Sequence, residues 1–165
     1  MTAAAIAACV VFLGFSLRYA WWRSKVPESK PRVLMYHMVA SPVPRARFNK
    51  LRVDPKMFER QIKWLRDDGW TFVFVSDLLQ NTQPKSVAIT FDDGYLDNFT
   101  HADAILEKYD AKATLYLVVD RHNRDWSAYK NPDRRDGELG REEKLDNEHV
   151  KTMIESNRWE LGAHT

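Results

Sequence analysis

Apolar runs of strand length alternate with segments of helical periodicity along most of this 165-residue chain. Near the start of this alternation, Asp54-Pro55 combines an N-cap residue with a proline in the first helical turn, and Gly69 follows as a stop signal. Because strands that alternate with helices form parallel sheets, the pattern predicts an α/β fold with a parallel sheet or barrel. The strand-like runs are 32–39, 70–75, 86–91, 113–119 and 158–164, and the helical segments are 54–68, 97–109 and 146–156.

The N-terminal segment has a different character, since residues 2–17 contain no charge and no proline. With Tyr19, Trp21 and Trp22 included, a helix here would reach about 30 Å, the thickness of the hydrocarbon core of a bilayer, with aromatic residues at headgroup level. We therefore predict one transmembrane helix as a single-pass membrane anchor. The predicted organisation is an anchor at 1–22, a polar linker at 23–31 and a domain at 32–165.

Charge and cysteine content exclude several classes of function. The net charge is +2, and basic residues are scattered among acidic ones, which argues against nucleic acid as a partner. The single cysteine, Cys9, lies in the N-terminal apolar run, so the domain has no cysteine nucleophile and no thiolate metal site. A metal ion in the domain would need carboxylate and imidazole ligands. The segment 120–146 is rich in charges of both signs and reads as a solvated excursion, in which Trp126 is a candidate for substrate contact.

The segment most indicative of chemistry is Thr90-Phe91-Asp92-Asp93-Gly94-Tyr95, directly after an apolar strand. Ligands of parallel α/β folds bind beyond the carboxyl ends of strands, where these residues would lie. Two adjacent carboxylates repel each other unless a divalent cation separates their roles, with one as ligand and the other as proton acceptor. Composition alone gives equal weight to a simpler interpretation, in which both aspartates only form a strand-to-helix turn.

The stretch from Val87 to Tyr95 resembles the first motif of the polysaccharide deacetylase (NodB-like) family. Val33 to His37 resembles the first strand of the members that act on poly-N-acetylglucosamine, and Ala113 to Leu117 resembles the strand after the first motif. Leu161-Gly162-Ala163-His164-Thr165 is similar to the start of the second motif. The resemblance covers about residues 32–165 and implies the N-terminal portion of a deformed (β/α) barrel.

The resemblance also implies a reaction and a set of roles. Asp92 would be the general base, Asp93 and His164 would be metal ligands, and His37 and Tyr95 would contribute to substrate binding. The cofactor would be a divalent metal, with zinc as the default. The reaction would be removal of N-acetyl groups from an N-acetylglucosamine-containing polysaccharide by a hydrolase whose catalytic domain faces away from the cytoplasm. The basic residues that follow the apolar run point to the opposite membrane orientation.

The resemblance stops inside the second motif, at Thr165, before its second histidine. Two protein ligands are fewer than the three that catalytic zinc sites use, and barrels have about 200 residues or more. We therefore expect no deacetylase activity from residues 1–165 alone. One alternative is a truncated, non-catalytic, membrane-tethered protein that binds sugar or a partner through a degenerate deacetylase fold. A phosphoryl-transfer enzyme is a weaker alternative, because its carboxylates would be two residues apart.

Overall fold

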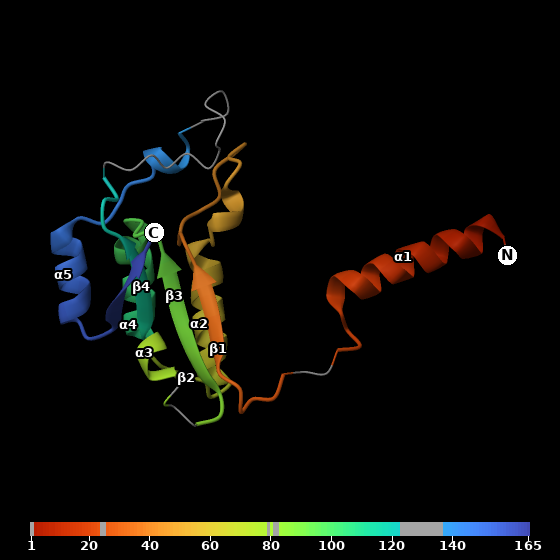
Figure 1. The fold of residues 1–165 in the computed structure, drawn as a ribbon, viewed down its shortest axis with the longest axis horizontal. Helices are drawn as coiled ribbons and strands as arrows, with labels where there is room; N and C mark the ends of the chain where they lie inside the picture. The colour runs from red at the N-terminus through yellow and green to blue at the C-terminus, as the bar shows by residue number, and fades with distance from the viewer. Residues whose placement is uncertain (1, 24–25, 79, 81–82, 123–136) are drawn as a thin grey trace.

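A five-stranded parallel sheet organises the molecule (Figure 1). The computed structural model describes residues 2–23, 26–78, 80, 83–122 and 137–165. Four strands follow the order β1-β3-β4-β5, and the short β2 pairs with the start of β3. The strands are β1 Arg32–Tyr36, β2 Thr71–Phe72, β3 Ser86–Asp92, β4 Ala113–Val118 and β5 Trp159–His164. The helices are α1 Ala3–Tyr19, α2 Pro55–Asp67, α3 Val75–Leu78, α4 Asp103–Lys108 and α5 Asn147–Glu155, with single turns at Asn49–Leu51 and Leu139–Arg141.

Strand β3 lies at the centre of the sheet, and every residue from Ser86 to Phe91 is buried. It pairs in parallel with β1 on one side and with β4 on the other, so that Phe91 is in register with both Tyr36 and Leu115. A strand that is covered on both faces reads as a continuous apolar run, which is why 86–91 was recognisable as a strand in the sequence. The predicted parallel α/β organisation is confirmed, as an open sheet.

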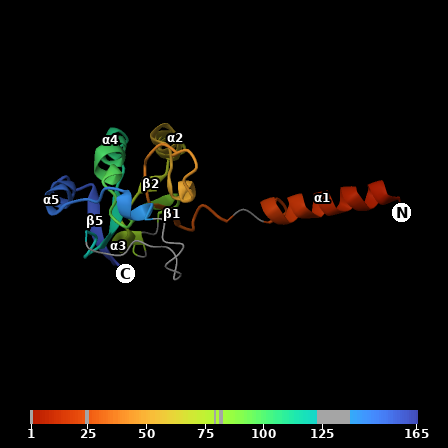
Figure 2. The ribbon, with the colours of Figure 1, turned by 90° about the horizontal axis from the view of Figure 1, so that it is seen from above.

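The two faces of the sheet are covered unequally. Helices α2 and α4 lie over one face, where Phe58 of α2 packs against Tyr36 and Phe91 with ring centroids 5.0 and 5.7 Å apart (Figure 2). The short helix α3 lies against the other face, and its Ser76 hydroxyl donates a 2.6 Å hydrogen bond to Glu160 of β5. Beyond α3 this second face is less covered, since Val33 and Met35 of β1 are both exposed.

Several predicted elements have shifted boundaries. Helix α2 begins as predicted, because the Asp54 carboxylate accepts a hydrogen bond from the Lys56 N–H, and Gly69 follows with φ +80°. The strand expected at 70–75 is reduced to β2, since α3 starts at Val75. The helix expected at 97–109 is divided into a π-helical turn, Asn98–Ala102, and α4.

The predicted solvated excursion falls partly outside the described residues, as does Trp126 within it. In its described portions, residues 120–122 and 137–146, most residues are exposed or half-buried, but Arg121, Leu139 and Leu145 are buried. The many charged residues around Leu139 and Leu145 gave no sign in the sequence that these two leucines are buried.

The predicted transmembrane helix is also wrong. Among the described residues, no helix combines the length and the apolar character needed to cross a bilayer. Helix α1 has 17 residues, which corresponds to about 25 Å, and it ends where Ala20 adopts the left-handed conformation (φ +46°). Trp21 then folds back, and its indole N–H donates to the Ser16 hydroxyl at 3.1 Å. Trp21 and Trp22, which were expected to extend the helix, therefore lie beyond its end at Tyr19.

Candidate active site

The turn after β3 holds two carboxylates in a constrained backbone. Asp92 is the last residue of β3, and Asp93 and Gly94 both have positive φ, +74° and +68°. The Asp93 N–H donates to the Tyr116 carbonyl of β4 at 3.1 Å, which fixes the turn against the neighbouring strand. Glycine suits the positive φ of this position, and a Cβ atom there would lie 2.5 Å from Leu117 Cδ1, the end of a flexible side chain that would have to move.

The carboxyl end of β5 brings an imidazole to this turn. His164 ends β5 and is in register with Val118 of β4. Its Nε2 atom lies 3.7 Å from Asp92 Oδ2 and 3.9 Å from Asp93 Oδ1. The structure thus brings together the three residues that the sequence singled out, although it does not test the roles predicted for them.

Burial and neighbouring charges act on the carboxyl group of Asp92. Its side chain is 14% exposed, and this burial raises its pKa above the ordinary value. The negative charge of Asp93 adds to the rise, whereas His37 and His164 act in the opposite direction. His37 follows β1 and is half-buried, so the structure places this predicted residue within electrostatic reach of Asp92.

Tyr95 lies behind the turn and is not among the residues that line the groove in front of it. Its side chain is fully buried and packs in a small cluster with Met38 and Leu139. Burial raises the pKa of its hydroxyl, and the Asp93 carboxylate adds to this effect. The ring supports the turn from below, while the predicted contact with substrate stays a prediction.

A groove of about 560 Å³ is lined by Asp92 and His164, on the less covered face of the sheet. Tyr116 and Gly162 are in register on β4 and β5, and a Cβ atom on Gly162 would lie 2.5 Å from the Tyr116 ring. Gly162 therefore leaves the space in which the Tyr116 ring forms part of the wall. The residues lining the groove are Val33, Met35, Val75, Thr90, Asp92, Tyr116, Ala163, His164 and Thr165.

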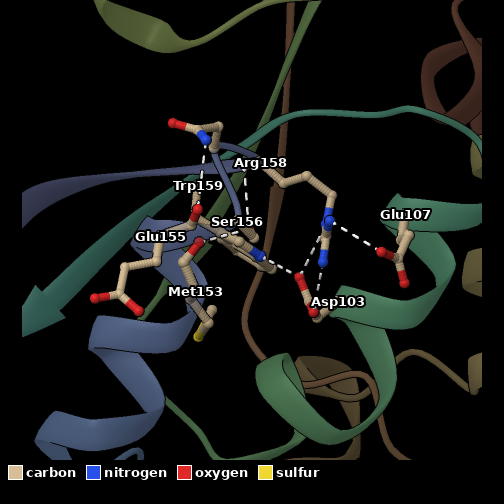
Figure 3. Close-up of polar contacts among 8 residues, drawn as sticks. Asp103, Glu107, Met153, Glu155, Ser156, Arg158 and Trp159 are labelled. Atoms are coloured by element: carbon tan, nitrogen blue, oxygen red, sulfur yellow. Dashed lines mark hydrogen bonds and ion pairs between the residues drawn. The ribbon is translucent and has the colours of Figure 1, made fainter.

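A polar clamp fixes the start of β5, and with it the strand that ends in His164 (Figure 3). Asp103 of α4 accepts hydrogen bonds from Arg158 Nε at 3.3 Å, Arg158 Nη2 at 3.0 Å and Trp159 Nε1 at 2.7 Å. The preceding turn is closed by the Ser156 hydroxyl, which donates to the Met153 carbonyl at 2.6 Å. Sequence reasoning missed this clamp, because its partners come from elements far apart in the chain.

A second group that sequence reasoning missed lies behind the turn. The segment 143–145 pairs with the turn residues, since the Leu96 N–H donates to the Glu143 carbonyl and the Leu145 N–H to the Gly94 carbonyl, both at 2.9 Å. Next to it, Arg52 forms an ion pair with Glu142. Asp97 is half-buried beside these residues, and this burial raises its pKa to about 6. In the sequence it is only the first residue of the predicted helical segment 97–109.

The side chains at the turn are of the types that bind a divalent cation, but their number is smaller than a catalytic zinc site needs. Carboxylate oxygen and imidazole nitrogen are the ligand types that zinc and similar ions take in the absence of cysteine. In the ranges that the structure describes, no group of three or more His, Cys, Asp or Glu side chains is arranged to hold a metal ion. Asp93 and His164 therefore offer two donors, one fewer than a catalytic zinc site uses.

Comparisons with known proteins relate this chain to one family. The sequence profile of the polysaccharide deacetylase family matches residues 79–165. YxkH of Bacillus subtilis (strain 168), a curated relative named as a polysaccharide deacetylase, is 40% identical over 105 residues, which are 60% of this chain and 35% of YxkH.

Solved structures show the same architecture. IcaB from Ammonifex degensii superposes with a TM-score of 0.64 at 25% identity, over 83% of this chain and 53% of IcaB. The Streptococcus pyogenes deacetylase PplD, solved in complex with acetate, gives 0.63 at 28% identity, over 85% of this chain and 57% of PplD. The chain thus spans about a third of YxkH and just over half of these two structures. Since the family profile covers more than half of its length, the chain belongs to the polysaccharide deacetylase family.

Proposed function

We propose that these residues form part of a metal-dependent hydrolase that removes N-acetyl groups from a polysaccharide of N-acetylated amino sugars. The observation that carries the proposal is the approach of His164 Nε2 to within 4 Å of both Asp92 and Asp93, at the edge of an open groove. Turn chemistry alone accounts for the two aspartates but gives no reason for an imidazole from β5 to meet them.

In this proposal Asp92 is the general base. A carboxylate with a raised pKa accepts a proton more readily near neutral pH than an exposed one does. Asp92 lines the groove and lies in the sheet, where pairing with β4 fixes its backbone. It would take a proton from the water that attacks the acetamide carbonyl. The C–N bond then breaks, and the products are acetate and an amine, which takes up the proton.

Asp93 and His164 would hold the divalent cation, with zinc as the default. When bound, such an ion supplies Lewis acidity toward the acetamide carbonyl and the attacking water. The chain's own contribution is to hold both donors in place from different strands. Asp93 is fixed by its bond to the Tyr116 carbonyl, and His164 by the pairing of β5 with β4.

The substrate would be an N-acetylglucosamine-containing polymer. Tyr116, on the groove wall, offers an aromatic face of the kind on which sugar rings stack, and the groove is open to solvent. PplD, a deacetylase, was solved with acetate, the acid that such a reaction releases. Family membership and the geometry of the turn together favour amide hydrolysis over phosphoryl transfer.

Metal binding tests the assigned roles directly. Zinc titrated into the chain by calorimetry should bind with a stoichiometry of one. Asp93→Ala and His164→Ala should each weaken binding by a factor of about 10 or more, because either change leaves one protein donor. Asp92→Asn should retain zinc, since Asp92 is assigned to proton transfer. Asp110→Asn, a fully solvated carboxylate paired with Arg66 at the surface, serves as the matched control.

The activity assay uses the full product of the native gene, which contains these residues. Acetate release from N-acetylglucosamine oligomers should disappear in Asp92→Asn while zinc remains bound. An Asp93→Ala variant with undiminished zinc affinity would contradict the assigned ligands, and an Asp92→Asn variant with wild-type turnover would contradict the assigned base.

A further inference from the structure

The short segment that follows β1 is held by hydrogen bonds at every backbone polar group from the His37 carbonyl to the Val39 carbonyl. The Met38 N–H donates to the Leu51 carbonyl at 3.0 Å, and the Met38 carbonyl accepts from the Val53 N–H at 2.9 Å. Buried backbone groups need partners, and these two find them in the backbone of a neighbouring loop. The other groups of the segment are paired with side chains.

Three side chains at the π-helical turn supply these remaining partners. The Asn98 Nδ2 atom donates to the His37 carbonyl at 2.9 Å. Asp97 accepts a hydrogen bond from the Val39 N–H at 2.8 Å. His101 Nδ1 lies 2.8 Å from the Val39 carbonyl, and since a carbonyl only accepts, this nitrogen carries the proton. The position of the segment after β1 is therefore set by residues that follow the acidic pair in the chain.

Asn98 is the member of this group whose residue type packing explains least. It is fully buried, and its Nδ2 atom also donates to Asp97 Oδ1 at 3.0 Å, which orients the amide. In the part of the chain that the structure describes, its Oδ1 atom has no hydrogen-bond partner. A buried acceptor without a partner costs stability, so an apolar side chain would be more stable here unless the amide donor is needed. That donor serves the His37 carbonyl.

His37 continues β1 alongside the end of β3. Tyr36 of β1 is in register with Phe91 of β3. The next residues along the two strands are His37 and Asp92, so these lie side by side, on strands about 4.8 Å apart. Met35, two residues before His37, lines the groove together with Asp92, and the alternation of side chains places His37 on the same side. His37 accordingly acts on the carboxyl group of Asp92.

We propose that Asn98 is a positioning residue, whose side-chain amide holds the His37 carbonyl and thereby keeps the His37 imidazole beside Asp92 at the rim of the groove. Its effect on catalysis rests on the proposed deacetylase function, in which His37 contributes to substrate binding. Its hold on His37 does not depend on that function. Removal of the amide should leave the acidic pair in place but release the residue that orients the substrate.

Steady-state kinetics on N-acetylglucosamine oligomers test the positioning role, with the full product of the native gene. Asn98→Ala should raise KM about fivefold and change kcat by less than about twofold, because the substrate loses an oriented contact while the base remains. A residue that only stabilises the fold would make unfolding easier without this difference between KM and kcat.

A double-mutant cycle shows whether Asn98 acts through His37. His37→Ala should raise KM at least as much as Asn98→Ala does. In the His37→Ala background, Asn98→Ala should change KM by less than about 1.5-fold, since the residue that it positions is gone. An undiminished effect of Asn98→Ala in that background would overturn the proposal, as would an unchanged KM in Asn98→Ala alone.

Two further variants separate positioning from loss of stability. Asn98→Leu fills a similar space without a donor and should reproduce the rise in KM, and it replaces Asn98→Ala if that variant fails to fold. Asn49→Ala is the matched control, because the Asn49 amide donates to the Val43 carbonyl at 2.7 Å in a loop that does not line the groove. It should leave KM unchanged, and an equal rise in KM there would contradict a specific role for Asn98.

The chemical reactivity of the His37 ring gives a readout that needs neither metal nor activity. Carbethoxylation by diethyl pyrocarbonate, followed by peptide mass spectrometry, should be about threefold faster at His37 in Asn98→Ala, because the segment opens more often. His149, in the capping box of α5, is the internal reference and should react at the wild-type rate. An unchanged rate at His37 contradicts the proposal. If the wild-type protein releases no acetate, the proposed function fails, and the rate at His37 still decides whether Asn98 holds this residue.

Discussion

At the scale of single residues, the candidate site depends on carboxyl groups in different surroundings. Asp92 is raised in pKa by burial at the groove, and Asp97 by deeper burial behind the turn. The sequence identified Asp92 as a candidate site residue but not Asp97. Asp92 follows an apolar strand and belongs to a recognisable motif, whereas Asp97 is one charged residue of a helical segment, and only the fold shows that it is half-buried.

The raised pKa of Asp97 predicts a pH-dependent contribution to stability. A carboxyl group with a folded pKa of about 6 binds a proton in the folded state between about pH 4 and pH 6, where the unfolded chain has lost it. Stability should therefore fall as pH rises through this window, by about 2 kcal/mol. Asp97→Asn retains an oxygen that accepts from the Val39 N–H and should flatten this dependence. Urea unfolding between pH 4.5 and 8 measures it. An unchanged slope in Asp97→Asn, with Asp110→Asn as reference, would exclude Asp97 as its source.

At the scale of elements, the Asp103 clamp decides where β5 starts. One carboxylate receives hydrogen bonds from both Arg158 and Trp159, and thereby ties α4 to the turn between α5 and β5. The sequence indicated α5 and β5 by their apolar periodicity, but periodicity carries no information on which polar residue fixes their mutual position. The same limit applies to the division of the segment 97–109 into a π-helical turn and α4.

Two acidic residues that pair with the same arginine allow a matched comparison. Asp103→Ala should lower the free energy of unfolding by about 2 kcal/mol, because it removes the partner of the Trp159 N–H and leaves Arg158 with only its exposed pair to Glu107; the side chains of Arg158 and Asp103 are only 22% and 18% exposed. Glu107→Ala removes a 66% exposed partner of Arg158 and should cost no more than about 0.5 kcal/mol. Equilibrium denaturation of the two variants tests this, and equal losses would show that the clamp has no special weight.

At the scale of the whole molecule, the parallel order of strands and the meeting of Asp92, Asp93 and His164 could be foreseen. Parallel strands place their carboxyl ends at one edge, so the ends of β3 and β5 were expected at the same edge, and the strand order sets them on either side of β4. The N-terminal helix was misjudged because apolar composition was extended through Trp21 and Trp22, while the backbone ends the helix at Tyr19. The amino-acid composition of a segment does not show at which residue a helix ends.

Helix α1 stands apart from the sheet (Figure 1), and all of its residues except Ser16 are exposed. Removal of residues 1–22 should therefore change the thermal midpoint of the remaining domain by less than about 2 °C, since few contacts with the sheet are lost. Differential scanning calorimetry of the two forms provides the measurement. A fall of about 5 °C or more would mean that α1 packs on the domain in solution.

The seating of the Tyr116 ring against Gly162 has a consequence for reading natural variation in such chains. A substitution at Gly162 leaves Asp92, Asp93 and His164 unchanged. A check of these three residues alone would therefore classify the variant as neutral. Any side chain there would nevertheless push the ring out of the groove wall, between the two strands that carry the donors. On the proposed deacetylase function, substitutions at Gly162 that leave Asp92, Asp93 and His164 unchanged should thus reduce activity.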